Sequence, residues 1–457
     1  MRTSPAKTRS QSDSNGVEVP PPIYFLLLTV EDLRCFGPRQ TLDLSDGNDH
    51  PKQWTILLGD NGVGKTTLLQ CLAGLQPFHH CSEQTGFFGL LPRLYKRDVD
   101  GFLVEDYRVG RTTDARFHIR ADLSMNANLT SLKHGTRISG WSVEGRIRET
   151  SATPAGENLR GLICYGYGAN RRMGTTDLSE AQTTDTIISL FDENAALINA
   201  EEWLLQADYA AKSLEGEDQK RAQTRRDRIK AMVIRLLPDV SDLRFAPSRE
   251  ARMRTTVQAQ TPYGWVSIRD VSLGYRTLMT WMVDFASRLF ERYPDSPDPF
   301  GEPAIALVDE IDLHLHPRWQ RTLMQFLSDM FPNTQFIASA HSPLVVQAAT
   351  NANVVLLRRE GDHVVIDNDV QAIKGWRVDQ VLTSELFSLD SARPPQLDAA
   401  LKERTLLLSK ARLTTQDKAR LHELEAQIGS LPTGETVQDI EAMDIIRRAA
   451  DLLTTQE

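Results

Sequence analysis

The chain divides into strands and helices because its apolar residues follow two different periods. Residues 54–58 and 304–308 are unbroken apolar runs of strand length. A strand that is apolar on both faces belongs in a parallel sheet that helices cover on each side. Residues 23–45 instead hold an apolar stretch, a bend at 34–37 and an alternating stretch, and this pattern predicts a β-hairpin.

Helical spacing marks the stretches 66–73, 186–237, 274–292 and 318–331. Asn199, with Glu202 three residues later, is a helix-start signature in the second of them. Shorter alternating runs predict an antiparallel sheet, and they lie at 102–104, 116–123 and 136–148. The predicted fold class is therefore α/β, with helices on a mixed or parallel sheet and an antiparallel β subdomain.

The same pattern predicts the domain organisation. Residues 1–22 are rich in Ser, Pro, Lys, Arg and Gln, and we expect them to be disordered. A head follows over 23–375, with an insertion at about 76–260 that holds the β subdomain and then the helices of 186–237. Residues 376–457 form a helical region that we expect to dock a partner or a second copy. Its predicted apolar stripes are Leu397, Leu401 and Leu408; Leu421, Leu424 and Ile428; and Ile440, Met443, Ile446, Ala450 and Leu453.

Composition narrows the class of protein. Apolar residues make up 40% of the 457 residues and charged residues 25%, values that are ordinary for a soluble protein. The net charge of -9 does not attract nucleic acid or an anionic membrane to the molecule as a whole. The four cysteines have no metal-type spacing, and no apolar run approaches the ~20 residues of a membrane span. We expect a cytoplasmic protein.

One local stretch, 219–230, is basic and has two interpretations. Its cations are Lys220, Arg221, Arg225, Arg226, Arg228 and Lys230. They either contact a nucleic-acid backbone or form a solvated helix face that nearby acidic residues balance. Those acids include Glu217 and Asp227, and we favour the balanced face.

The strongest chemical signal is a phosphate-binding loop between a strand and a helix. It has the pattern G-x-x-x-x-G-K-T, and its expected contact residues are Gly59, Asp60, Asn61, Gly62, Val63, Gly64, Lys65, Thr66 and Thr67. Glycines let successive N–H groups turn toward an anion, and the following helix adds its positive end. Lys65 supplies a charge for the β- and γ-phosphates, and the Thr66 hydroxyl is placed to ligate Mg²⁺.

A second motif supplies acids and a base. The run 304–308 ends in Asp309 and Glu310, at the carboxyl end of a buried strand, where α/β sheets bind ligands. We expect Asp309 to hold Mg²⁺ and Glu310 to orient or deprotonate an attacking water. The strand at 335–340 ends in His341, which can hydrogen-bond a γ-phosphate.

Two further segments each allow a functional and a simpler interpretation. Asp312, His314 and His316 alternate as metal ligands can, but Pro317 opens a helix there and we discount a metal site. The loop 166–172 contains two glycines and two arginines. It either approaches a nucleotide or forms a surface turn, and its pattern does not favour one over the other.

Together these motifs resemble the ATPase head of the ABC/SMC class. Residues 59–66 are similar to the Walker A motif, 304–310 to the Walker B motif and 312–317 to the D-loop, with His341 as the switch histidine. Ser272 and Gly274 occupy the place of the L-S-x-G signature, with Val271 where the family has Leu. The Q-loop has no clear counterpart, and the loop 166–172 is the best candidate.

The resemblance implies a geometry and a reaction. ATP with Mg²⁺ is held between the phosphate loop of one copy and the signature of another, so that two heads form a head-to-tail homodimer. Lys65, Glu310 and His341 would be catalytic, and Ser272 and Gly274 would touch the opposite nucleotide. The reaction expected is hydrolysis of ATP to ADP and phosphate.

The helical C-terminal region further resembles the PtuA-like ATPase subunit of Septu and retron-associated anti-phage defence systems. The resemblance implies higher homo-oligomers and a separate HNH-type effector nuclease that the ATPase controls. The alternative is a RecF-like repair ATPase that binds duplex DNA through the basic stretch 219–230. A third possibility is a scaffold that binds ATP and hardly hydrolyses it.

Overall fold

The computed structural model describes most of the chain outside its two ends. The described residues are 20–82, 87–92, 117–130, 135–146, 149–153, 159–174, 185–237, 239–247, 255–370, 375–387, 389, 392, 395–410 and 413–428. Contacts divide the chain into two compact units, Met1–Val381 and Leu382–Glu457. Among the helices in these ranges, none combines the length and apolar character that a membrane crossing requires.

A six-stranded sheet organises the first unit. Its order is β18–β17–β3–β16–β15–β9. The strands are β3 (Trp54–Leu58), β9 (Cys164–Tyr167), β15 (Ala304–Val308), β16 (Thr334–Ser339), β17 (Asn353–Glu360) and β18 (His363–Asp367). All neighbours pair in parallel except β17 and β18. The two runs that the sequence analysis assigned to buried parallel strands, β3 and β15, are buried along their whole length, as predicted.

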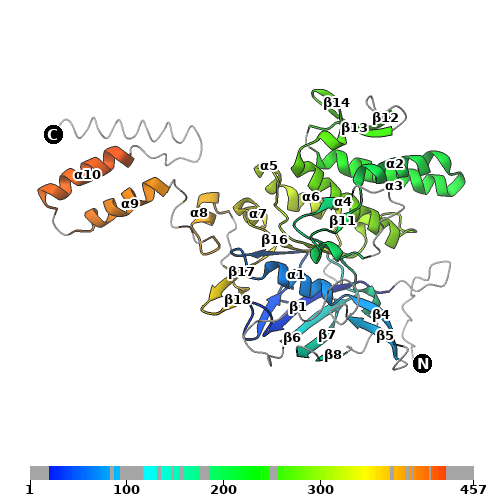
Figure 1. Ribbon diagram of the computed structural model, residues 1–457, viewed down its shortest axis with the longest axis horizontal. Helices are drawn as coiled ribbons and strands as arrows, with labels where there is room; N and C mark the ends of the chain where they lie inside the picture. Colours follow the sequence, from blue (N-terminus) through cyan, green and yellow to red (C-terminus); the bar gives the residue numbers. More distant parts are fainter. Residues whose placement is uncertain are drawn as a thin grey trace, which may run out of the picture. The chain divides into compact units, whose positions relative to one another are not determined.

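A five-stranded antiparallel sheet faces the first sheet across helix α1 (Lys65–Gly74) (Figure 1). Its order is β2–β1–β6–β7–β8. The strands are β1 (Ile23–Glu31), β2 (Gln40–Asp43), β6 (Phe117–Met125), β7 (Thr136–Arg146) and β8 (Glu149–Thr153). One apolar core joins β1, α1 and the six-stranded sheet, and it includes Phe25, Leu68, Leu72 and Ile337. The predicted hairpin at 23–45 and the antiparallel sheet are confirmed, but the hairpin belongs to that sheet.

The opposite face of the six-stranded sheet packs against α4 (Leu273–Arg292). Phe285 of α4 lies edge-on to Tyr165, Tyr167 and Phe336, with ring centroids 5.2, 6.4 and 6.5 Å away. The helix predicted at 318–331 is interrupted, and forms α5 (Pro317–Gln320) and α6 (Leu323–Met330). The Thr322 hydroxyl donates back to the carbonyls of Arg318 and Trp319, which is a common cause of a bend.

Smaller elements complete the unit. They are β4 (Pro77–Ser82), β5 (Phe87–Pro92), β10 (Arg172–Met173), β11 (Ala196–Leu197), α7 (Pro343–Ala348) and α8 (Val378–Leu382), the last at the division between the units. The three strands β12 (Asp242–Pro247), β13 (Thr255–Thr261) and β14 (Gly264–Ser267) form an antiparallel sheet next to the helical insertion. The run predicted at 102–104 lies outside the described residues.

The insertion contains two long helices, α2 (Ala200–Ser213) and α3 (Gly216–Leu236). Asn199 caps α2, and its side chain accepts from the N–H groups of Glu201 and Glu202, as the sequence predicted. Residues 191–199 are not helical, however, so the predicted span of 186–237 was too long. The Asp192 carboxylate accepts from Asn194 N at 2.8 Å, and that local bond favours a turn over a helix.

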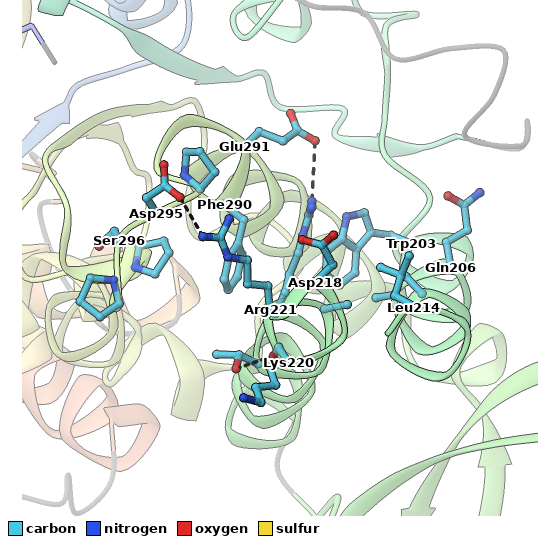
Figure 2. Close-up of a pocket in the computed structure, with 18 residues that line it drawn as sticks. Trp203, Gln206, Leu214, Asp218, Lys220, Arg221, Phe290, Glu291, Asp295 and Ser296 are labelled. Carbon is cyan, nitrogen blue, oxygen red and sulfur yellow. Dashed lines mark hydrogen bonds and ion pairs between the residues drawn. The ribbon is translucent and has the colours of Figure 1, made fainter. Parts of the chain in front are cut away.

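The six basic residues of the stretch 219–230 on α3 are paired within the chain. The pairs are Lys220–Glu217, Arg221–Asp295, Arg225–Glu291, Arg226–Asp208 and Asp227, Arg228–Asp298, and Lys230–Asp242. Figure 2 shows Arg221 and Glu291 at the wall of a pocket of about 730 Å³ between α2, α3 and α4. These pairs agree with a balanced helix face, although most of the acids come from other elements than α3.

The second unit contains α9 (Pro395–Leu408) and α10 (Thr415–Ile428), packed on each other. Ala400, Leu407 and Leu424 are buried between them, with Leu421 and Ile428 alongside. The predicted stripe was wrong at Leu408, which is 52% exposed. The apolar face of α9 runs through Ala400 and Leu407 instead, because α10 covers that side. The stripe predicted from Ile440 to Leu453 lies outside the described residues.

Candidate functional site

The phosphate-binding loop has a backbone that favours glycine at three positions. Gly59, Gly62 and Gly64 have φ angles of 135°, 80° and 89°, all in the range that side chains disfavour. At Gly59 an added Cβ would lie 2.3 Å from the carbonyl oxygen of Leu357 on β17. The glycines therefore serve two purposes, because they permit the turn and let the loop lie directly on the sheet.

Lys65 is the first residue of α1 and is buried, at 6% exposure. Its Nζ donates to the carbonyl oxygens of Gly59 and Asp60 at 2.7 and 2.9 Å, which keeps the ammonium at the mouth of the loop. Burial lowers the pKa of Lys65, and the carboxylates of Asp309 and Glu310 oppose that shift. The loop thus directs a cation toward the place where a phosphate would lie.

The tip of the β1–β2 hairpin forms part of this site, which the sequence analysis did not predict. A Cβ on Gly64 would lie 2.5 Å from the Cys35 sulfur and 2.9 Å from the Phe36 ring. Arg34 donates to Thr67 Oγ1 at 3.3 Å and to Gln70 Oε1 at 3.1 Å, both on α1. No local signal could have shown this contact, because the hairpin tip and the loop are joined only by the fold.

The two side chains predicted to ligate Mg²⁺, the Thr66 hydroxyl and the Asp309 carboxylate, lie together. Thr66 Oγ1 donates to Asp309 Oδ2 at 2.7 Å, across the boundary between α1 and the end of β15. The other carboxylate oxygen of Asp309 accepts from Ser339 Oγ at the end of β16. A hydroxyl beside one carboxylate is the oxygen set that Mg²⁺ uses when phosphates and water supply its other ligands. The residues therefore fit the ion.

Glu310 follows Asp309 and has a φ of 46°, which is uncommon for a residue with a side chain. Its N–H donates to Ser339 Oγ at 2.7 Å, so one serine holds both acidic residues of the motif. The side chain of Glu310 is half-buried. A half-buried carboxylate next to the proposed magnesium ligand is placed where a base for a bound water is expected.

His341 lies at the end of β16, beside the strand that carries Asp309. The residue is exposed, and its main-chain N–H donates to Asp312 Oδ2 at 3.0 Å. Asp312 is buried, and this bond joins the segment after β15 to the segment after β16. His316 caps α5 through a bond from Arg318 N to its Nδ1. Within the described ranges no cluster of three or more metal-ligating side chains occurs.

The loop 166–172 lies beside the acidic motif and is buried at Gly166–Gly168 and at Arg171, while Asn170 and Arg172 are exposed. Arg171 is 4% exposed, and its guanidinium donates to the carbonyl oxygens of Gly168, Asp309 and Glu310. Burial lowers the pKa of Arg171 to about 10, against the opposing effect of Asp309. Ser339 and Arg171 support the main chain and the Asp309 carboxylate of the site. The loop that carries Arg171 was a candidate in the sequence, whereas Ser339 belongs to no motif that sequence alone identifies.

The signature-like residues lie at the start of α4. Ser272 is exposed at the start of α4, and its side chain makes no capping bond to the helix. A Cβ on Gly274 would lie 2.2 Å from the carbonyl oxygen of His314, so α4 begins against the segment after β15. Leu273, between them, is 53% exposed. An exposed serine and leucine here leave this end of α4 open to another molecule.

This fold and site are those of a P-loop protein, with a mostly parallel sheet and with a phosphate loop and an acidic motif at the ends of strands β3 and β15. Comparison with known families agrees with that class. Residues 190–347 match the family described as "AAA domain, putative AbiEii toxin, Type IV TA system". The match begins after the phosphate loop, and it includes the acidic motif and His341.

Curated relatives specify the resemblance further. The chain is 26% identical over 394 residues to a Septu protein PtuA of Bacillus mycoides (strain KBAB4), which is 84% of this chain and 47% of that protein. It is 45% identical over 92 residues to the Retron Vc95 probable ATPase of Vibrio cholerae serotype O1 biovar El Tor, 20% of this chain and 18% of that protein. It is 36% identical over 132 residues to the Retron Ec83 probable ATPase of Escherichia coli, 29% and 23% of the two chains. The resemblance to defence ATPases is confirmed, and the chain spans less than half the length of these relatives.

Solved structures that align with the chain include SMC heads. An SmcHead bound to the C-winged helix domain of ScpA aligns over 75% of this chain and 96% of that chain, with a TM-score of 0.42 and 15% identity. The SMC head domain from Thermotoga maritima aligns over 75% and 97%, with a TM-score of 0.36 and 13% identity.

Proposed function

We propose that the chain binds ATP with Mg²⁺ and hydrolyses it to ADP and phosphate, as the ATPase of an anti-phage defence system. The observation that carries the proposal is the bond from Thr66 to Asp309, with Lys65 buried in the loop beside it and Glu310 next in sequence. Charge stabilisation and positioning are what phosphoryl transfer requires from a protein.

Each residue has a defined task in this reaction. The loop N–H groups and Lys65 bind the phosphates, and Thr66 with Asp309 would hold Mg²⁺, which neutralises charge on the β- and γ-phosphates when bound. Glu310 accepts a proton from the attacking water as the bond from the γ-phosphorus to the bridging oxygen breaks. His341 donates a hydrogen bond to the transferred group, while Ser339 and Arg171 keep the acidic turn in place.

We further propose that two copies complete the site. Ser272, Leu273 and Gly274 begin α4 and lie on the segment after β15, with Ser272 and Leu273 exposed. In a head-to-tail dimer of heads they would cover the nucleotide of the opposite copy, so ATP would join the heads and hydrolysis would separate them. We also propose that a separate effector nuclease is the partner that this cycle controls, as the resemblance to Septu and retron ATPases implies.

The decisive experiment measures ATP affinity and turnover of the full chain. We expect Lys65→Ala to lose ATP binding and Glu310→Gln to retain binding but lose turnover. A wild-type chain that neither binds nor hydrolyses ATP overturns the proposal. For the partner, affinity purification after co-expression with the neighbouring genes should recover a nuclease, and recovery of none would remove that part.

Direct binding of duplex DNA, the alternative, gains no support from α3. Each of the six cations on its basic stretch has a carboxylate partner in the chain. Cations that are already paired contribute less to a polyanion site than free ones, because binding must first break those pairs.

A further inference from the structure

A buried carboxylate in the middle of α4 joins three parts of the first unit. The side chain of Asp284 is 1% exposed. Its Oδ2 accepts from Tyr167 Oη at 2.9 Å and from Arg288 Nε at 2.8 Å. Its Oδ1 accepts from Ile198 N at 3.4 Å, just before the cap of α2. A charge this deeply buried needs such partners, so the group is fixed from several sides.

Tyr167 links this carboxylate to the acidic motif. It is the last residue of β9 and is 1% exposed. Its carbonyl oxygen accepts from Asp309 N at 2.8 Å. Its ring lies against Trp281 of α4, with centroids 5.4 Å apart. Burial and the neighbouring Asp284 charge raise the pKa of Tyr167 well above its usual range, so the phenol stays a donor. One residue thus contacts Asp309 through its main chain and α4 through its side chain.

Arg288 completes the group from one turn further along α4. Its side chain is 13% exposed, and it pairs with Asp284 at four residues' spacing. Burial lowers the pKa of Arg288, but the Asp284 charge outweighs that effect and the pKa is raised. Asp284 therefore meets both a charged partner in its own helix and a neutral partner from the sheet. The charged pair satisfies the carboxylate, while the phenol sets the position of the helix against β9.

The position of this contact along α4 matters for the helix start. Asp284 lies twelve residues after Ser272, which is about 18 Å along a helix axis. Ser272 itself is exposed, and its side chain makes no capping bond to the helix. The start of α4 is therefore oriented by contacts further along the helix and by the approach of Gly274 to His314.

We propose that Tyr167, Asp284 and Arg288 are positioning residues that hold α4 in register with Asp309. A change at Asp309 when nucleotide binds is then passed through Tyr167 to the exposed start of α4 at Ser272. This inference rests on the proposed function, because it needs a nucleotide at the phosphate loop.

The test uses the full chain, a magnesium complex of a non-hydrolysable ATP analogue, and hydrogen–deuterium exchange of peptides covering 272–280. Tyr167→Phe removes only the hydroxyl. Tyr165→Phe is the matched control, since Tyr165 lies two residues earlier on β9 and also packs against Phe285. We expect the analogue to slow exchange at 272–280 in the wild type and in Tyr165→Phe. In Tyr167→Phe most of that protection should disappear, while analogue affinity stays within about threefold of the wild type.

The outcomes separate this inference from the function it rests on. Analogue binding by Tyr167→Phe with the full wild-type protection at 272–280 overturns the positioning role and leaves the ATPase proposal intact. No binding by the wild-type chain overturns both. A merely structural role would lower the melting temperature of Tyr167→Phe and keep the protection. If Tyr167→Phe does not fold, Asp284→Leu is the second variant, because it is similar in size and removes the acceptor of the Tyr167 hydroxyl bond. Unchanged protection in that variant also refutes the inference.

Discussion

Thr66 and Asp309 are 243 positions apart in the chain, yet the hydroxyl of one donates to the carboxylate of the other at 2.7 Å. The contact exists because α1 starts beside the end of β3, and β3 is separated from β15 only by β16. Two motifs that are unrelated along the chain therefore meet at the carboxyl edge of one sheet, where such folds bind ligands.

The first prediction concerns the Thr66 hydroxyl. Thr66→Ala removes a ligand next to a charged group, and we expect affinity for the magnesium complex of ATP to fall about 10- to 100-fold. Thr66→Ser keeps the hydroxyl and should bind within a few-fold of the wild type. Isothermal titration at several magnesium concentrations measures this effect, and equal affinities for the two variants would refute the ligand role.

The second prediction concerns Glu310. Glu310→Gln keeps the shape of the side chain but removes the base, so turnover should fall about 10²- to 10⁴-fold. ATP binding should persist, and ATP-bound dimers should accumulate in mass photometry. Glu360→Gln is the control, because Glu360 lies on β17 in an exposed ion pair with Arg358. Normal turnover by Glu310→Gln would assign the base elsewhere.

The third prediction compares two glycines with similar backbone angles. Gly64 and Gly47 have φ values of 89° and 85°, but only Gly64 lacks space for a Cβ. Gly64→Ala must displace Cys35 and Phe36, and should destabilise the fold by about 1–3 kcal/mol more than Gly47→Ala. Chemical denaturation of both variants gives the difference. Equal stabilities would mean that the hairpin tip does not rest on the loop as described.

The fourth prediction concerns the basic face of α3. Because Arg225 and Arg226 face Glu291 and Asp208, reversing both charges should lower the melting temperature by like-charge repulsion. Duplex DNA should leave ATP turnover of the wild type unchanged. Stimulation by DNA that falls steeply with salt, and that the double variant abolishes, would instead favour the DNA-binding alternative.

The fifth prediction concerns pH and the start of α10. Thr414 and Asp417 bond each other's N–H groups at 3.1 and 2.9 Å, and Lys410 contacts the same carboxylate. The Lys410 contact and then the Thr414 bonds lower the pKa of Asp417 to about 2. A lowered pKa stabilises the helix above the unfolded value of 3.8, and the benefit disappears as pH falls through about 2.

The predicted loss of α10 stability at low pH can be checked in the full chain. Cleavage by an acid protease inside α10 should increase between pH 4 and pH 2, as mass spectrometry of the fragments would show. Asp417→Asn cannot titrate, so its cleavage should depend less on pH over that range. A wild-type profile identical to that of Asp417→Asn would contradict the role of the carboxylate.

The sequence predicts the residues expected to act on the nucleotide better than it predicts the residues that hold them in place. Lys65 and Glu310 belong to short motifs whose spacing reflects local backbone geometry, so they can be read without a structure. Arg171, Ser339 and Cys35 act through contacts that the fold brings together, and no period in the chain marks them. Asp284 looks like an ordinary polar residue on the helix pattern of 274–292, although it is buried against β9.

The errors have the same origin. Leu408 fits an apolar stripe when α9 is considered alone, but α10 packs on the side of Ala400 and Leu407. The helix expected over 318–331 has a continuous pattern, yet the Thr322 hydroxyl bonds back to its own main chain and interrupts it. Periodicity indicates which element can form, and tertiary partners decide its ends and its buried face.

The close approach of Gly274 to His314 has a consequence for the two nucleotide sites of the proposed dimer. The segment that follows one copy's acidic motif and the helix start that would cover the other copy's nucleotide touch each other directly. In the proposed dimer, a displacement after the acidic motif of one copy would thus move residues at the nucleotide of the other copy. In the proposed head-to-tail dimer, this contact would couple the nucleotide site of each copy to that of the other.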